Sequence, residues 1–227
     1  MVGLILGGGS KLGLELSTLL SKTYDLTLIT SNPTKLGNVR EVVVNWQSFG
    51  LKALNTAIYH FIRDNQKLDL IIFNQNSKQG PNTVDFFDPD YLNCLYKNWI
   101  SGYRSDCMIS YYVVQNLAKH IHENTKICWM FSGLINEYIE VEKYNHAAYR
   151  SIKLTNYFIM NSFNAKLNSI FCGIDPGHIT EENRLTKAEQ IVEYLNGADH
   201  ASKGKVFAIE SNSFWDPSLP NAMTGPI

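Results

Sequence analysis

A tyrosine and a lysine stand four residues apart in the stretch NHAAYRSIKLTNYF, as Tyr149 and Lys153. Residues four apart on a helix lie on the same face, one turn from each other. A phenol releases its proton only near pH 10, but a neighbouring ammonium favours the phenolate and brings the hydroxyl into the range of acid–base catalysis. In a chain with twelve tyrosines, about one such spacing is expected by chance. The pair therefore predicts chemistry only if its surroundings support it.

A second candidate is the glycine-rich stretch LILGGGSKLGLELS near the start of the sequence. The apolar run Val2–Leu6 leads directly into Gly7, and an amphipathic stretch begins at Lys11. This order of strand, glycine turn and helix is the context of a dinucleotide-binding fingerprint, in which helix N–H groups face a pyrophosphate. A nucleoside-triphosphate P-loop needs Gly-Lys-Ser/Thr at the end of the turn, and this turn ends in Lys-Leu-Gly.

The glycine spacing follows a seven-residue form, G-x-x-x-G-x-G, with Lys11 in place of the middle glycine. The strict form G-x-G-x-x-G fails, because Leu12 stands at its third glycine. Gly7 permits a tight exit from the strand, and Gly13 lets the helix pack closely on the sheet. The cofactor contacts expected in this turn are Gly7, Gly9, Ser10, Lys11, Leu12 and Gly13.

The second apolar run ends in Thr30-Ser31-Asn32. A cofactor with an unmodified ribose usually meets Asp or Glu at this position. Hydroxyl groups here, with Lys11 close to the turn, suit a 2′-phosphate better. We therefore expect NADP(H) rather than NAD(H), with Thr30, Ser31 and Asn32 among its contacts.

The elements that must position these candidates follow from the apolar pattern. Short runs rich in Ile, Val, Leu and Phe alternate with stretches of helical period. The expected strands are 2–6, 26–30, 39–45, 68–74, 126–131, 167–174 and 206–209, and the expected helices are 11–22, 48–65, 89–97, 102–123, 145–164 and 186–196. This alternation predicts an α/β fold, a Rossmann-like doubly wound parallel sheet of about seven strands with helices on both faces.

The composition is that of an ordinary globular protein, with 227 residues, 44% hydrophobic and 18% charged, and a net charge of −1. This balance gives no electrostatic case for binding nucleic acid or a membrane surface. The cysteines and histidines show no metal-ligand spacing, and the cysteines lie in apolar stretches, which favours reduced thiols and a cytoplasmic location. We expect one domain over 1–227, with 212–227 as a C-terminal tail that either covers the cleft or is disordered.

Together, these motifs resemble the short-chain dehydrogenase/reductase family over nearly the whole chain. The glycine turn comes first, LDLIIFNQNS stands where that family has N-N-A-G, and KICWMFSG stands where its catalytic serine follows a strand. Tyr149 and Lys153 follow in order. GIDPGHIT then matches the family segment P-G-x-x-x-T, and GKVFAIES matches its closing strand.

The resemblance implies an NADPH-dependent oxidoreductase that reduces a ketone or aldehyde, or oxidises the corresponding alcohol. In this reading Tyr149 gives a proton to the carbonyl oxygen, Lys153 favours the phenolate and holds the nicotinamide ribose, and Ser132 binds the substrate oxygen. The small-molecule substrate itself is not identified by any motif. The family usually forms homodimers or homotetramers. The further cofactor contacts that the resemblance implies are Asn45, Trp46, Asn74, Gln75, Asn76, Pro176, Gly177, Ile179 and Thr180.

Departures from the family pattern leave alternatives open. Ser132 precedes Tyr149 by more residues than is usual, and the asparagine that the family carries after its fourth strand has no clear counterpart, with Asn98, Ser105 and Asp106 as candidates. The segment after Gly177 is too short to cover a pocket. This indicates an open cleft for a large substrate, a lid from another subunit, or a lost substrate role. In the last case the chain is a catalytically weak or inactive sensor or scaffold that binds NADP(H).

Overall fold

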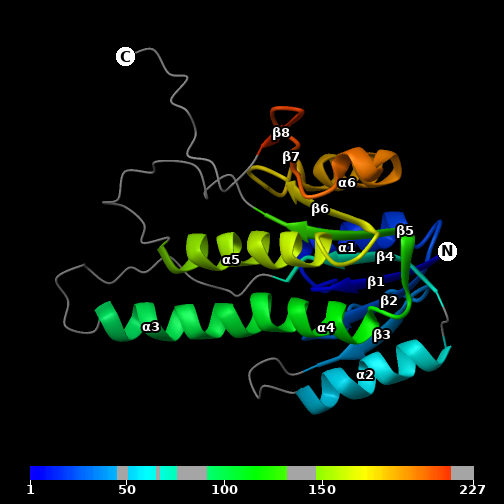
Figure 1. Cartoon of the computed structure of the whole chain (residues 1–227), viewed down its shortest axis with the longest axis horizontal. Coiled ribbons are helices and arrows are strands. Elements are labelled where there is room, and N and C mark those ends of the chain that lie inside the picture. The colour runs from blue at the N-terminus through cyan, green and yellow to red at the C-terminus, as the bar shows by residue number, and fades with distance from the viewer. Residues whose placement is uncertain (45–50, 65–66, 76–90, 132–146, 216–227) are drawn as a thin grey trace.

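In the computed structural model, the described residues are 1–44, 51–64, 67–75, 91–131 and 147–215. Within these ranges eight strands form one sheet, in the order β3-β2-β1-β4-β5-β6-β7-β8 (Figure 1). Neighbouring strands are parallel except for the last pair, β7 and β8. The doubly wound parallel sheet predicted from the sequence is confirmed. The strands are β1 Val2–Leu6, β2 Asp25–Thr30, β3 Arg40–Val43, β4 Leu68–Phe73, β5 Ile121–Met130, β6 Ile170–Asp175, β7 Val206–Ala208 and β8 Ser213–Trp215.

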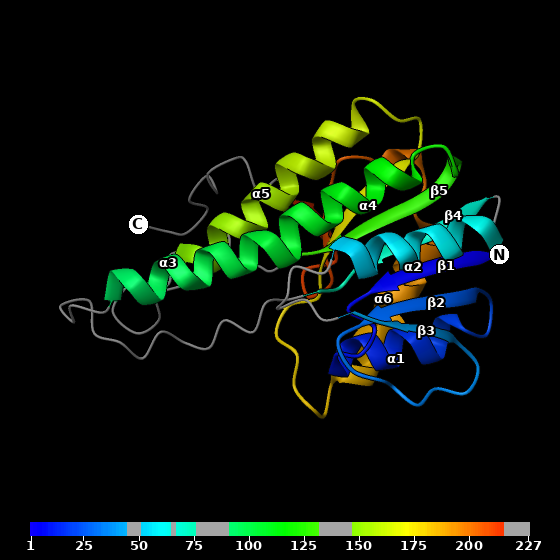
Figure 2. The same cartoon turned by 90° about the horizontal axis from the view of Figure 1, so that it is seen from below.

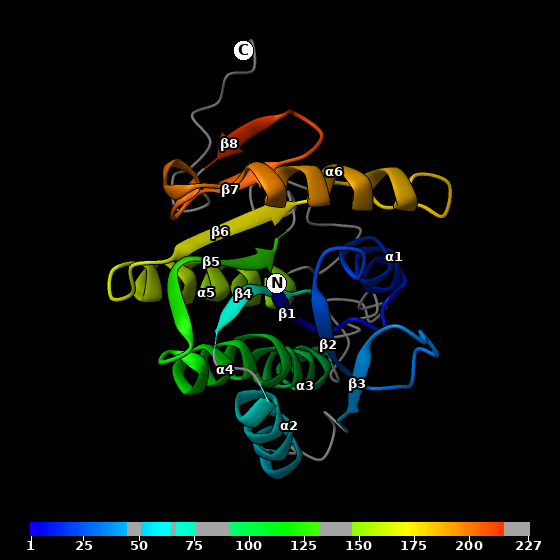
Figure 3. The same ribbon diagram turned by 90° about the vertical axis from the view of Figure 1, so that its right-hand side faces the viewer.

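Helices cover both faces of this sheet (Figure 3). Helices α1 and α6 pack on one face, and α2, α4 and α5 pack on the other. Helices α3 and α5 lie against each other and extend beyond the carboxyl ends of the strands (Figures 1 and 2). None of the helices in the described part of the chain is both long and apolar enough to cross a membrane. The helices are α1 Lys11–Leu20, α2 Leu51–Asp64, α3 Tyr91–Gly102, α4 Ile109–Leu117, α5 Ala147–Asn164 and α6 Arg184–Gly197.

The central strands are apolar on both sides because each face has its own core. Successive side chains of a strand point to opposite faces. Leu4 and Leu6 of β1 accordingly join the core under α2, α4 and α5, whereas Ile5 joins the core under α1 and α6. Sheets covered on both faces need such continuous apolar runs, which is why these strands could be predicted from the apolar pattern of the sequence.

The predicted boundary at residue 123 is wrong, because residues 121–123 belong to a strand and not to the helix expected over 102–123. The break expected between the helices 89–97 and 102–123 is wrong too, because α3 continues to Gly102 and helical residues follow directly. Helix α4 ends at Leu117, whose carbonyl accepts a hydrogen bond from the N–H of His120. Ile121 then pairs with Leu68, and β5 bulges before it regains its register further along. Thr125 Oγ1 donates to the Leu68 carbonyl at 2.5 Å within this bulge. The apolar period of the sequence continues through Ile121, so no local signal marked the change.

Strand β8 lies in a stretch that the sequence suggested would be a tail. Residues Ser213–Trp215 pair antiparallel with β7. Phe214 stacks edge-on against Phe207 at 5.4 Å between ring centroids, which anchors the strand at the edge of the sheet. The remainder of the expected tail, residues 216–227, lies outside the described residues.

Candidate active site

The carboxyl ends of the parallel strands share one edge of the sheet, and most candidate residues follow these ends. The glycine turn follows β1, Thr30 ends β2, and Asn74 follows β4. Strands β2 and β4 both neighbour β1, so the chain reverses its winding direction at β1. In doubly wound sheets, ligands bind in the crevice at this switch point, outside the carboxyl ends of the strands.

The glycine turn is held closely against the end of β4. Gly7 has a φ of +79°, and a Cβ on it would lie 2.6 Å from the backbone nitrogen of Gln75. A Cβ on Gly13 would lie 2.4 Å from the carbonyl oxygen of Gly7. The side-chain amide of Asn74 donates to Ser10 Oγ at 2.8 Å and to the Gly7 carbonyl at 3.2 Å. Only glycine therefore fits at these two positions of the turn.

The first turn of α1 suits an anion. Ser10 caps the helix, with its hydroxyl accepting from the Gly13 N–H at 3.0 Å, and no acidic residue stands in the first turn. The N–H groups at a helix start lack intrahelical partners and carry partial positive charge. Together with the absence of side chains at the glycines, this set of donors fits the pyrophosphate of a dinucleotide. Leu12, also expected here, is buried in the core beneath α1.

At the end of β2, Thr30 is buried and its hydroxyl donates to the carbonyl of Asn32 at 2.5 Å. Gly9 lies over this turn, where a Cβ would be 3.3 Å from the Cβ of Thr30. Ser31 and Asn32 are exposed, and their polar side chains form a carboxylate-free end to the strand.

Lys11 forms an ion pair with a residue that the sequence did not indicate. Its ammonium lies 2.6 Å from Glu181, in the segment between β6 and α6, and both side chains are exposed. The hydrogen bond and the charge of Lys11 lower the pKa of Glu181 below its usual range. Lys11, the first residue of α1, thus already has a carboxylate beside it.

The segment after β6 forms a compact turn on the sheet edge. Gly177 has a φ of +70°, and its N–H donates to Asp175 Oδ1 at 3.0 Å. The N–H of His178 and the ammonium of Lys187 both donate to Glu210 Oε1, at 2.9 and 3.2 Å, and lower the pKa of this carboxyl. Helix α6 begins soon afterwards, at Arg184.

The other predicted residues of this segment divide between core and surface. Pro176 is buried, Ile179 packs against the core beneath α1 and α6, and Thr180 is exposed. The Thr180 N–H donates to Asn183 Oδ1 at 2.8 Å, just before α6. The turn is therefore anchored to the fold on both sides.

Tyr149 and Lys153 lie one turn apart on α5, with the lysine ammonium 5.6 Å from the centroid of the tyrosine ring. Lys153 is buried, and its Nζ donates to the carbonyl of Met130, the last residue of β5, at 3.0 Å. Tyr149 is partly exposed. The pair is thus fixed to the same sheet edge as the glycine turn. The expected residues Ser132, Asn45, Trp46 and Asn76 lie outside the described residues.

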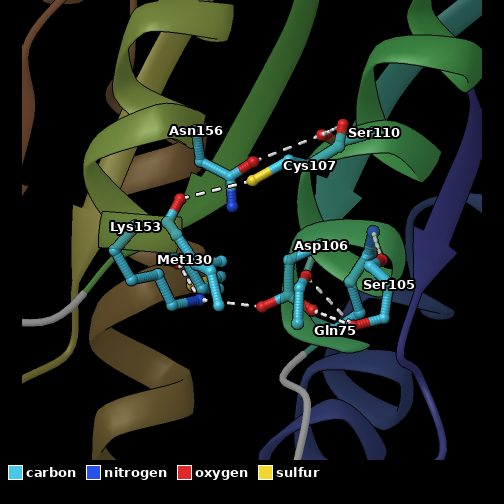
Figure 4. A network of polar contacts seen from close by, with 10 residues as sticks. Gln75, Ser105, Asp106, Cys107, Ser110, Met130, Lys153 and Asn156 are labelled. Carbon is cyan, nitrogen blue, oxygen red and sulfur yellow. Dashed lines mark hydrogen bonds and ion pairs between the residues drawn. The ribbon is translucent and has the colours of Figure 1, made fainter. Parts of the chain in front are cut away.

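Opposite Lys153, helices α3 and α4 are joined by a π-helical segment, Tyr103–Met108. This segment places Asp106 inside the protein, with its Oδ2 atom 3.9 Å from Lys153 Nζ (Figure 4). Gln75, which follows β4, donates from Nε2 to the Ser105 carbonyl at 3.0 Å. Of the two candidates for the family's asparagine position whose side chains the structure describes, Ser105 and Asp106, it is Asp106 that lies within ion-pair distance of the lysine. The sequence signal for it was its place relative to the asparagine of the family pattern.

No protein-family model matches this sequence, and no curated protein does so. Solved structures, in contrast, are similar over almost the whole chain. The proposed carbonyl reductase Sniffer of Caenorhabditis elegans has a TM-score of 0.76 and 14% identity, over 95% of this chain and 98% of the other. A carbonyl reductase of Pseudomonas aeruginosa in complex with NADP has a TM-score of 0.70 and 12% identity, over 95% and 99%.

A third similar structure is a short-chain dehydrogenase/reductase from Serratia marcescens, with a TM-score of 0.66 and 16% identity over 91% of this chain and 94% of the other. The chain therefore has the fold of the short-chain dehydrogenases/reductases, which confirms the resemblance seen in its motifs. Within that fold class, the similar structures include carbonyl reductases.

Proposed function

We propose that this chain is an NADP(H)-dependent oxidoreductase of the short-chain dehydrogenase/reductase type. It reduces a ketone or aldehyde, or oxidises the corresponding alcohol. The observation that carries the proposal is the fixed position of Tyr149 and Lys153 at the end of β5, on the sheet edge that also holds the glycine turn. The shared fold with carbonyl reductases supports it.

The chain's own residues account for the proton in this reaction. A bound nicotinamide supplies a hydride to the carbonyl carbon, or accepts one from the alcohol carbon in reverse. As the carbon–oxygen double bond becomes a single bond, the oxygen takes the proton of the Tyr149 hydroxyl. The nearby Lys153 ammonium stabilises the phenolate that remains. Ser132, which follows β5, is proposed to hydrogen-bond the same oxygen.

The preference for NADP(H) rests on groups at the ends of β1 and β2. The glycine turn and the start of α1 receive the pyrophosphate, while Lys11, Ser31 and Asn32 offer charge and hydrogen bonds to a 2′-phosphate. The solved complex of a similar carbonyl reductase with NADP supports this choice. The implied contacts at Asn45, Trp46 and Asn76 belong to the same proposal.

The first experiment is a fluorescence titration of NADPH with the purified protein, with NADH in parallel. We expect enhanced NADPH emission at micromolar concentrations and a weak response to NADH. A panel of ketones and aldehydes then tests turnover. Failure to bind either nucleotide overturns the proposal, whereas NADPH binding without turnover favours a sensor or scaffold of the same fold.

Tyr149→Phe tests the assignment of the proton donor. We expect kcat to fall by at least about 100-fold, with the Kd for NADPH unchanged, because only the hydroxyl is lost. Tyr111→Phe is the matched control, since Tyr111 is exposed on α4 and packs against Phe163 instead. Equal activity of Tyr149→Phe and wild type would exclude Tyr149 as the proton donor.

A further inference from the structure

The candidate site contains a buried pair of opposite charges. Asp106 and Lys153 expose only 2% and 3% of their surface, and 3.9 Å separates Oδ2 from Nζ. Burying two charges is costly, and apolar residues of similar volume would often stabilise a fold as well or better. Stability alone is therefore a weak reason for a carboxylate at this position.

The segment around Asp106 is held to neighbouring elements by several hydrogen bonds (Figure 4). The Oδ1 atom of Asp106 accepts a hydrogen bond from Ser105 Oγ at 2.7 Å, and Gln75 holds the Ser105 carbonyl from the end of β4. The neighbouring Cys107 thiol donates to the Ile152 carbonyl of α5 at 3.4 Å. The π-helical segment is thus bonded both to the strand that braces the glycine turn and to the helix that carries Lys153. Such segments are frequent at functional sites.

The separation of Asp106 and Lys153 indicates how the two groups interact. At 3.9 Å, the contact between Oδ2 and Nζ is too long for a hydrogen bond, so the carboxylate acts on the ammonium through its charge. The hydrogen bond of the ammonium goes to the Met130 carbonyl instead. These two contacts hold Nζ between the end of β5 and the π-helical segment, beside the ring of Tyr149.

We propose that Asp106 is a positioning residue, whose negative charge holds the Lys153 ammonium where it serves Tyr149 and the cofactor ribose. The inference rests on the proposed function. It assigns to this chain a carboxylate where the similar family pattern has an amide, and a role through charge rather than through hydrogen bonding. Asp106 and Lys153 together, and not Lys153 alone, then stabilise the phenolate of Tyr149.

Asp106→Asn tests the role of the charge, because it retains the size of the side chain and one acceptor oxygen for the Ser105 hydroxyl. We expect a higher Kd for NADPH and a lower kcat, each by about 10- to 100-fold as for other groups that orient a functional side chain. The KM for the carbonyl substrate should not change. Asp106→Glu keeps the charge and should recover part of both losses. Wild-type values for Asp106→Asn would overturn the proposal.

Asp69→Asn is the matched control for the loss of a paired carboxylate. Asp69 lies near the amino end of β4, on the opposite edge of the sheet, where Oδ1 is 3.3 Å from His122 Nε2 and Oδ2 accepts from the Val2 N–H at 2.7 Å. We expect this variant to retain the wild-type Kd and kcat even if it lowers stability. An equal loss of NADPH affinity in Asp69→Asn would overturn the specific role given to Asp106.

A double-mutant cycle on the Kd for NADPH separates positioning from a general loss of structure. If Asp106 acts through Lys153, adding Asp106→Asn to Lys153→Met has no further effect on the Kd. Additive losses would overturn the proposal. The double variant carries no unpaired buried charge, whereas each single variant leaves one, so the Kd values are compared once far-UV circular dichroism has shown that the variants keep the wild-type fold.

The same measurements distinguish this inference from the proposed function. A wild-type protein that binds NADPH but reduces no carbonyl compound contradicts the reductase, while the cycle on the Kd still tests Asp106. A protein that reduces carbonyl compounds equally well with and without the Asp106 charge contradicts only the positioning role. A protein that binds neither nucleotide contradicts both.

Discussion

The ammonium of Lys11 lies 2.6 Å from the carboxylate of Glu181, joining the start of α1 to the segment that precedes α6. The two side chains are 74% and 77% exposed, and ion pairs this exposed contribute little to stability. We expect this ion pair to affect the binding of the cofactor instead. Lys11 is the cation proposed to meet the 2′-phosphate, so Glu181 competes with the cofactor for the same ammonium.

Replacing Glu181 by Gln should therefore strengthen NADPH binding. We expect a decrease in the Kd of about two- to fivefold, the modest scale of an exposed ion pair, and little change for NADH, which lacks the 2′-phosphate. Fluorescence titrations at low and high salt measure the effect, which should shrink as salt screens the charges. Glu182→Gln removes the adjacent carboxylate as a control. An equal gain for NADH would contradict the proposed role of Lys11.

Replacing Gly13 by Ala should disrupt the glycine turn. The new methyl group would lie 2.4 Å from the Gly7 carbonyl oxygen, so the start of α1 must move away from the end of β1. We expect NADPH affinity to fall by up to about 100-fold, because displacements of this order misplace the donors to the pyrophosphate. In Gly197→Ala, the added methyl group meets no atom within 4 Å and should leave affinity unchanged. Unaltered NADPH affinity of Gly13→Ala would contradict the proposal that the glycine turn holds the pyrophosphate.

Replacing Gly177 by Ala should lower the free energy of unfolding by about 1–2 kcal/mol, the cost of a left-handed conformation for a residue with a Cβ. Gly177 has a φ of +70°, and its new methyl group would also meet the Glu210 side chain. Urea denaturation measures the loss. The control Gly197→Ala lies at the end of α6, where alanine is expected to be neutral or stabilising. Equal free energies of unfolding for Gly177→Ala and the wild type would show that the turn after β6 accepts a Cβ without strain.

Cys107 should resist alkylation in the native protein. Burial, with the charge of Asp106, raises the pKa of its thiol to about 12, while Lys153 acts in the opposite direction. The thiol, and not the reactive thiolate, is therefore present at pH 7–9. Burial likewise raises the pKa of Cys128. Iodoacetamide treatment followed by peptide mapping should find both modified only after unfolding. Rapid native labelling of Cys107 would show that the π-helical segment opens.

The sheet and the glycine turn could be predicted because local sequence determines them. Runs such as Val2–Leu6 need apolar residues on both sides, and only glycine fits at positions 7 and 13 of the turn. The position of Tyr149 and Lys153 on the same face of a helix also follows from their spacing of four residues. Contacts between distant parts of the chain had no such signal. The pairs Lys11–Glu181 and Asp106–Lys153, and the entry of Ile121 into β5, depend on how the elements pack.

The π-helical segment between α3 and α4 also has a consequence for sequence changes in this region. A π turn contains an additional residue compared with an α turn. Deleting one residue within Tyr103–Met108 would allow a continuous α-helix whose two sides keep about the same phase, because the wide π turn accommodates the additional residue. The packing of α3 against α5 could then persist, but Asp106 would lose the wide turn that places it beside the lysine. Chain length in this short stretch is therefore as constrained as residue identity, and insertions or deletions should be tolerated far less here than in the surface turns.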